Sequence, residues 1–237
     1  MSSEIQRLAE DVVETYFSQN TENRLLIGVA GPAGCGKSTI AFPLTNRIND
    51  ILITRSAASC EKAISAVCVS LDGWHYTRAQ LDQMDDPVKA HWWRGAHFTF
   101  DQAGYRTFLD LLRIPLSSAP SEIPFPTFDH ALKDPTLSPV PITHKDRLIL
   151  IEGLYTLFDL SGWKECAEMM DFKIWVDVNE ETARRRLVKR NFEAGIFDSL
   201  DACATRVDAV DMKNSEVVRA HASEPTHIFV SVDGQIY

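Results

Sequence analysis

The nine residues GPAGCGKST, at positions 31–39, constrain the fold more than any other part of the sequence. They contain the pattern G-x-x-x-x-G-K-[ST] and lie between an apolar run, LLIGVA, and a segment with helical spacing, KSTIAFPLTNRI. Glycine lets the backbone of such a loop turn several N–H groups inward, toward an anion at the helix N-terminus. The order of strand, loop and helix therefore predicts a site for the phosphates of a nucleoside triphosphate.

Individual residues of this loop have expected roles. Lys37 is expected to reach the β- and γ-phosphates, and the Ser38 hydroxyl is expected to bind Mg²⁺. The residues predicted to contact the nucleotide are Gly31, Pro32, Ala33, Gly34, Cys35, Gly36, Lys37, Ser38 and Thr39. A chance glycine-rich turn is the alternative, and the full match in this context argues against it. ATP with Mg²⁺ is the expected ligand.

Strands and helices are predicted to alternate along the chain after an amphipathic N-terminal helix within residues 1–22. Further strands are predicted at SAVCVSLD, RLILIEG, DFKIWVDV and THIFVSV. The proline-rich segment 114–146 predicts irregular structure with room for a β-hairpin, and DDPVKAHWWRGAHFTFD predicts a structured loop. The fold class is therefore α/β, a P-loop NTPase fold in one domain over 1–237, with a parallel sheet and helices on both faces.

Two carboxylates lie where predicted strands end. Asp72 ends AVCVSLD and Glu152 ends RLILIE, and ligands of a parallel sheet bind beyond the carboxyl ends of its strands. One such carboxylate can accept the proton of an attacking hydroxyl, and the other can hold Mg²⁺. The alternative is that either carboxylate caps a helix or pairs with Lys37.

Five basic residues fall within ARRRLVKR, residues 183–190, on a predicted helix with Asn179 as its N-cap. Arg186 and Arg190 share one face of that helix, because they are four residues apart. Arginines in a closing segment stabilise a transferred phosphoryl group, so we expect an Arg-rich lid at 184–197 that contributes to catalysis. A solvated charged surface is the alternative.

The overall charge and the cysteines limit the expected partners and compartment. A net charge of −9 argues against nucleic acid as a partner. The five cysteines are scattered without C-x-x-C or Cys/His spacing, so neither a zinc site nor a disulfide framework is expected. Because the sequence shows no signal-peptide core and no run of roughly 18 apolar residues, we expect a cytoplasmic protein with no membrane partner. The sequence leaves a homodimer open.

Other classes of nucleotide-binding protein lack their signatures here. A GTPase would carry N-K-x-D and an ABC ATPase would carry L-S-G-G-Q, and the segments NRIND, MKNSE and LSGW fit neither. One hypothesis is an enzyme that transfers a phosphoryl group to a small acceptor, a kinase. A P-loop ATPase or nucleotide-binding regulatory protein without a small acceptor is the alternative. A degraded kinase is disfavoured, because the four expected functional residues occur together: Lys37, Ser38, Asp72 and Glu152.

Four stretches together resemble the phosphoribulokinase/uridine kinase family of P-loop kinases. They are GPAGCGKST, LDGWH, LILIEGLY and the arginine-rich helix ending in RNFEAG. The elements DGWH, RGAHFTFD, PTFDH and EGLY are most similar to the branch that contains bacterial kinases associated with fructose transport and their fungal relatives. The resemblance implies transfer of the ATP γ-phosphate to a hydroxyl of a small metabolite: a nucleoside such as uridine, a sugar or pantothenate.

The resemblance also implies roles for single residues. Asp72 would be the general base, Glu152 would help to position Mg²⁺, and Arg186 and Arg190 would act from the lid, beside Lys37. The acceptor would be surrounded by His75, Arg94, Phe98, Asp101 and His130. The branch's usual Phe, Pro and Asn are replaced by Trp74, His97 and Leu154, and all three positions are expected at the acceptor pocket, so the acceptor stays open.

Overall fold

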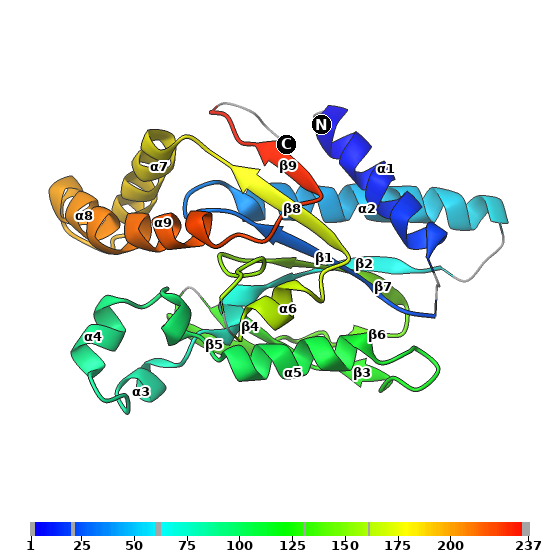
Figure 1. Ribbon diagram of the computed structural model, residues 1–237, viewed down its shortest axis with the longest axis horizontal. Coiled ribbons are helices and arrows are strands. Elements are labelled where there is room, and N and C mark those ends of the chain that lie inside the picture. Colours follow the sequence, from blue (N-terminus) through cyan, green and yellow to red (C-terminus); the bar gives the residue numbers. More distant parts are fainter. Residues whose placement is uncertain (1–2, 20–21, 60–62, 130, 161, 234–237) are drawn as a thin grey trace.

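A parallel sheet of five strands forms the centre of the computed structural model, which describes residues 3–19, 22–59, 63–129, 131–160 and 162–233. The strands lie in the order β2-β7-β1-β8-β9, and all neighbours pair in parallel (Figure 1). Their bounds are Leu25–Ala30 (β1), Ser65–Ser70 (β2), Asp146–Glu152 (β7), Phe172–Asp177 (β8) and His227–Val230 (β9). All five lie where strands were predicted, and the α/β fold class is confirmed.

Helices cover both faces of the sheet (Figure 1). Successive side chains of β1 enter different cores: Ile27 joins the cluster on one face and Leu26 the cluster on the other. Burial on both faces explains why β1 is apolar throughout rather than alternating. The helices on the first face are Ser3–Ser18 (α1) and Lys37–Ser59 (α2), and those on the second are Gln102–Arg113 (α5) and Lys164–Ala167 (α6).

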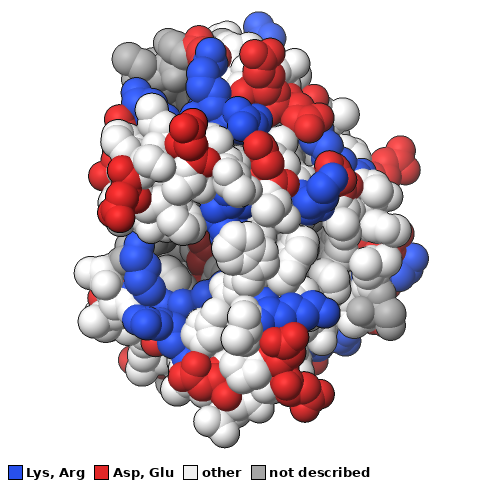
Figure 2. Space-filling model, turned by 90° about the vertical axis from the view of Figure 1, so that its left-hand side faces the viewer, with Lys and Arg blue, Asp and Glu red and all other residues white. Residues whose placement is uncertain are grey.

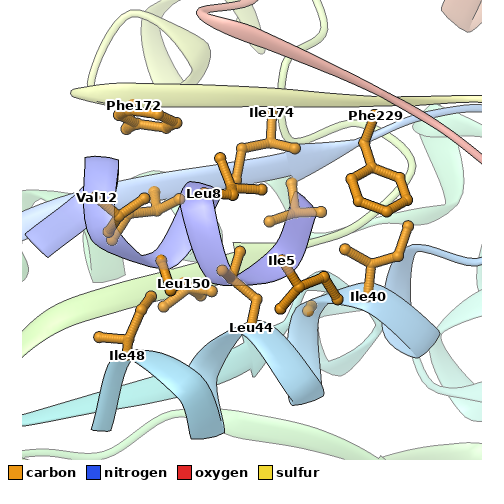
Figure 3. Packing of buried hydrophobic residues seen from close by; sticks show 14 of the residues in the cluster. Ile5, Leu8, Val12, Ile40, Leu44, Ile48, Leu150, Phe172, Ile174 and Phe229 are labelled. Carbon is orange, nitrogen blue, oxygen red and sulfur yellow. The ribbon is translucent and has the colours of Figure 1, made fainter. Parts of the chain in front are cut away.

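The N-terminal helix α1 belongs to the first of these cores. Ile5, Leu8 and Val12 are fully buried. Figure 3 shows them between α2 and the strands, where they face Leu44 of α2 and Ile174 of β8. The predicted helix within residues 1–22 is therefore present, and it packs as a layer of the domain.

Two groups of short elements lie at the carboxyl end of the sheet, because β2 and β8 lead directly into them (Figure 1). The group after β8 consists of Glu180–Glu193 (α7), Leu200–Arg206 (α8), Val207–Asp211 (η3) and Met212–Ala220 (α9). The element η3 is one turn of π-helix between α8 and α9, called the π-turn below. The group after β2 consists of the 3-10 turn Leu71–Trp74 (η1), Arg78–Leu81 (α3), Pro87–Trp92 (α4) and the 3-10 turn His97–Thr99 (η2). A cavity at this end of the sheet is lined by residues from both groups.

Local signals explain how two of these elements begin. The Asn179 side chain accepts hydrogen bonds from the N–H groups of Glu181 and Thr182 at 3.1 and 3.3 Å, so the predicted N-cap of α7 is present. The prediction of a structured loop is wrong over α4. Asp86 caps this helix by accepting from Lys89 N at 2.9 Å, and Pro87 occupies its first position.

The proline-rich segment 114–146 forms two short antiparallel pairs. They are Glu122–Ile123 (β3) with Ile142–Thr143 (β6), and Pro126–Asp129 (β4) with Asp134–Leu137 (β5). This agrees with the expectation of irregular structure with a hairpin. No helix in the described part of the chain is long and apolar enough to cross a bilayer.

Candidate active site

The glycine-rich loop between β1 and α2 is held by close packing as well as by its own turns. Gly34 and Gly36 have backbone φ values of +76° and +91°, which residues other than glycine rarely adopt. A Cβ on Gly31 would lie 2.3 Å from the carbonyl oxygen of Val176, and one on Gly34 would lie 2.7 Å from that of Ala183. The loop is therefore fixed against the end of β8 and against α7.

Lys37 is the first residue of α2, and its side chain turns back across the loop. Its Nζ donates to the carbonyl oxygens of Gly31 at 3.0 Å and Pro32 at 3.1 Å. The ammonium group is thereby held within the loop, at the helix N-terminus where the backbone favours anions. This arrangement suits a lysine that binds phosphate oxygens.

Glu152, the last residue of β7, is buried directly beside the loop. The hydroxyls of Ser70 and Ser38 lie near its carboxylate and act on its pKa. Burial, and next the charge of Asp72, raise the pKa of Glu152 above its usual value, while the two serines and Lys37 act in the opposite direction. The end of β7 thus brings a carboxylate and the Ser38 hydroxyl together, and these two oxygens could share a metal ion.

Asp72 lies on η1, one strand away from Glu152, with its side chain 46% exposed. The turn that carries it is held by the Ser70 hydroxyl, which accepts from Asp72 N at 3.3 Å. His75 Nδ1 lies 2.9 Å from the Asp72 carbonyl oxygen, and the His75 ring packs against Phe100 with centroids 3.9 Å apart. The Asp72 carboxylate is accessible while its backbone is fixed, which suits a general base.

Two cavities meet at the loop. The larger, of about 500 Å³, extends from the loop along α7 to residues 231–233, and the smaller, of about 220 Å³, extends toward Asp72 and His75. The residues that line both are Gly34, Lys37, Ser38 and Arg190. Figure 2 shows Lys and Arg side chains bordering a hollow on this face of the molecule, with acidic atoms visible inside it. A phosphoryl group at the shared residues is accessible from both cavities.

The two predicted lid arginines occupy different positions. Arg186 Nη1 donates to the Ser231 hydroxyl at 2.9 Å and to the Gly34 carbonyl at 3.4 Å, and the guanidinium also pairs with Asp233 at 2.9 Å. Arg190, one turn further along α7, lies where the two cavities meet. The helix therefore directs both side chains to the loop, with Arg186 on the larger cavity.

The structure brings together only some of the residues predicted around the acceptor. His75 lines the smaller cavity, whereas Arg94, Phe98 and Asp101 are not among its lining residues. Arg94 pairs with Asp134 at 2.8 Å, Phe98 is exposed, and Asp101 caps α5 by accepting from Gly104 N at 2.9 Å. His130 lies outside the described residues.

The three residues that depart from the family branch also lie in different places. Leu154 lines the smaller cavity, but Trp74 is buried against Tyr105 and Phe108 in the core. His97 packs against Phe158, and burial lowers the pKa of its imidazole. Of these three, Leu154 alone is in a position to contact an acceptor.

Several lining residues were not predicted from the sequence. Phe100, Gly95 and the backbone of Gly153 contribute to the smaller cavity, and Asp211 and Asn214 line it from the group after β8. Asp211 ends the π-turn and Asn214 follows three residues later, so both project from one face. The spacing D-x-x-N carries no recognisable motif, and only the fold places it at the site.

Gly73, beside Asp72, has no room for a side chain. A Cβ at this position would lie 2.3 Å from the carbonyl oxygen of Pro126 in β4. We expect Gly73→Ala to displace η1, to destabilise the fold by about 1–3 kcal/mol, and to lower turnover by moving Asp72. Thermal melting and steady-state kinetics test this, and a variant with wild-type melting temperature and kcat would contradict it.

Comparisons with known proteins agree with this geometry. The model of the phosphoribulokinase/uridine kinase family matches residues 26–232. The ATP-dependent kinase-like protein notR' of Aspergillus versicolor is 40% identical over 146 residues, 62% of this chain and 85% of that protein. A proposed uridine kinase of Schizosaccharomyces pombe, C227.14, is 32% identical over 204 residues, 86% of this chain and 82% of that protein.

A solved structure extends the likeness to the whole fold. A proposed fructose transport system kinase from Silicibacter sp. TM1040 superposes with a TM-score of 0.80 at 25% identity, covering 97% of this chain and 99% of that one. The matched residues include the glycine-rich loop, both strand-end carboxylates and α7. The chain therefore belongs to the phosphoribulokinase/uridine kinase family of P-loop kinases.

Proposed function

We propose that this protein transfers the γ-phosphate of ATP to a hydroxyl of a small metabolite. One observation carries the proposal: the cavity along the loop and the cavity of Asp72 share Lys37, Ser38 and Arg190. A nucleotide in the larger cavity would place its terminal phosphoryl group at these residues. An acceptor in the smaller cavity would then face that group with Asp72 beside its hydroxyl.

The transfer step follows from these positions. The acceptor oxygen forms a new bond to the γ-phosphorus, while the bond from that phosphorus to the β,γ-bridging oxygen breaks and ADP leaves with the electron pair. The proton of the acceptor hydroxyl passes to the Asp72 carboxylate. Lys37 and Arg190 stabilise the negative charge that spreads over the transferred oxygens.

The residues at the end of β7 fit Mg²⁺. The Glu152 carboxylate and the Ser38 hydroxyl line the same cavity, and both offer oxygen ligands, which this ion prefers. Among the described residues no group of three or more His, Cys, Asp and Glu could hold a metal, but Mg²⁺ commonly takes one or two protein oxygens with the substrate phosphates. When bound, the ion would neutralise charge on the phosphates.

A screen for ADP release tests the proposed function. Purified protein with ATP and Mg²⁺ is offered metabolites that carry hydroxyl groups, with Asp72→Asn as the matched control. We expect at least one acceptor to raise ADP release strongly over the rate without acceptor, with a phosphorylated product detected by mass spectrometry. Hydrolysis that no acceptor changes would instead indicate the alternative, an ATPase or a nucleotide-binding regulatory protein.

The arginines of α7 give a separate test of the lid. We expect Arg190→Ala and Arg186→Ala to lower kcat by about 10²-fold while nucleotide affinity changes much less, because the charge acts mainly on the transition state. Lysine at either position should rescue only partly, since it lacks the planar fork of the guanidinium. Steady-state kinetics and nucleotide titration measure both effects.

Lys189→Ala is the matched control for these variants. Lys189 lies on the same helix, is exposed, and pairs with Glu193 at 3.8 Å. Its replacement should leave kcat and the melting temperature near wild type. Unchanged turnover in both arginine variants would show that this part of α7 is only a charged surface.

A further inference from the structure

The acceptor end of the smaller cavity carries negative charge. Among the described residues that line this cavity, the cations are Lys37 and Arg190, and both also line the nucleotide cavity. The carboxylates are Asp72, Glu152 and Asp211. If the proposed function holds, the two cations and Glu152 serve the phosphates and their metal ion. Asp72 and Asp211 then remain to face the acceptor.

Asp211 is held in place as a carboxylate that can accept hydrogen bonds. Its side chain is three-quarters buried, and it forms an ion pair with Arg206 Nη1 at 3.8 Å, a distance longer than a hydrogen bond. Arg206 is fixed behind it, 5.4 Å over the Trp92 ring. Burial raises the pKa of Asp211, while Arg206 and then Arg190 act against this rise. At 3.8 Å, Arg206 faces the carboxylate without using its hydrogen-bonding capacity.

The π-turn that carries Asp211 is tied to the phosphate-binding loop. The Ser215 hydroxyl donates to the Asp211 carbonyl oxygen at 2.8 Å and accepts from Ala33 N at 3.0 Å. Asn214, buried beside Ser215, presents an amide to the same cavity. This wall of the cavity is therefore positioned relative to the phosphates, as a specificity-determining wall must be. Single π-helical turns inside α-helices are frequent at functional sites.

We infer that Asp211 and Asn214 select a neutral, polyhydroxylated acceptor of sugar size and discriminate against hydroxy acids. This inference rests on the proposed function. A carboxylate beside an amide accepts and donates hydrogen bonds to hydroxyl groups, and it repels an anionic substrate. The cavity of about 220 Å³ is smaller than the roughly 300 Å³ at which pockets for drug-sized ligands begin, which favours a compact acceptor.

Matched pairs of alcohols and acids test the inference in the wild-type protein. The pairs are glycerol and D-glycerate, D-ribose and D-ribonate, and panthenol and pantothenate, with D-fructose and uridine as further neutral probes. We expect kcat/KM to favour the neutral member at least tenfold in each pair that is turned over. Preference for the acid members would overturn the inference while leaving the kinase assignment intact. Hydrolysis indifferent to every probe would overturn both.

Two variants then assign the preference to this wall. Asp211→Asn should raise KM for the best neutral acceptor about tenfold and shift the preference toward the acid, with kcat and the KM for ATP near wild type. Asn214→Asp, which leaves the pair of Asp211 and Arg206 in place, should strengthen the preference for the neutral member. A purely structural role would lower the melting temperature without changing the preference.

Asp208→Asn is the matched control. Asp208 belongs to the same π-turn, but its carboxylate pairs with Arg184 at 2.6 Å, and neither residue is among those that line the two cavities at the loop. Its replacement should leave the acceptor preference unchanged. An unchanged preference in both Asp211→Asn and Asn214→Asp would overturn the assignment.

Discussion

Replacing Lys37 with Ala is expected to reduce phosphoryl transfer by about 10³-fold or more. The ammonium group now bonds to the carbonyl oxygens of Gly31 and Pro32, so its loss removes a charge from the loop and two contacts that shape it. We expect nucleotide binding to weaken as well, because the same charge attracts the phosphates before the reaction. Turnover with a saturating acceptor and nucleotide titration measure the two losses.

Lys213→Ala is the control for a lysine at the surface. Lys213 lies on α9 and pairs with Glu216 at 2.8 Å, with more than half of its side chain exposed. This variant should keep wild-type kinetics. If Lys37→Ala retained activity within a few-fold of wild type, the glycine-rich loop would not be the phosphate site, and the proposed function would fail with it.

The second large effect is expected at Asp72. Asp72→Asn keeps the size of the side chain but removes the group that accepts the proton, so kcat should fall by about 10²- to 10⁴-fold. ATP affinity should stay within a few-fold of wild type, because Asp72 lines the smaller cavity and not the larger one. The Asp72 backbone contacts with Ser70 and His75 do not depend on the carboxylate, so folding should be preserved.

Asp82→Asn provides the comparison with a carboxylate outside the site. Asp82 is exposed and lies 2.8 Å from His91 Nε2, at the end of α3. The substitution Asp82→Asn should leave kcat unchanged. An equal loss of turnover and of ATP affinity in Asp72→Asn would show that Asp72 binds the metal ion or stabilises the fold. Another group would then accept the proton.

The parts predicted well from the sequence are those governed by local order. The loop at 31–39, the carboxylate Glu152 and the N-cap Asn179 depend on neighbours in the chain, and Asp72 lies on η1, two residues after the end of β2. The structure places all of them at one end of the sheet. Strand ends converge there because the strands are parallel. Such residues can be found before any coordinates exist.

The acceptor wall could not be predicted in this way. Asp211 ends a π-helical turn inside a segment that is helical throughout residues 200–220, and residue spacing does not show where such a turn occurs. Arg94 and Asp101 match motif positions, yet nearby partners, Asp134 and Gly104, engage their side chains. Which polar groups face a ligand is decided by long-range packing and by competition for hydrogen bonds, and neither is visible in residue spacing.

The helix α1 has a consequence for the smallest piece of this chain that can keep the sheet dry. The shared family pattern begins at residue 26, but the helix before it contributes Ile5, Leu8 and Val12 to the core beneath β1 and β8. A chain cut at the start of the common pattern would expose that core to water. A helix that carries none of the candidate site residues is therefore needed to keep water away from the interior side of the strands that position them.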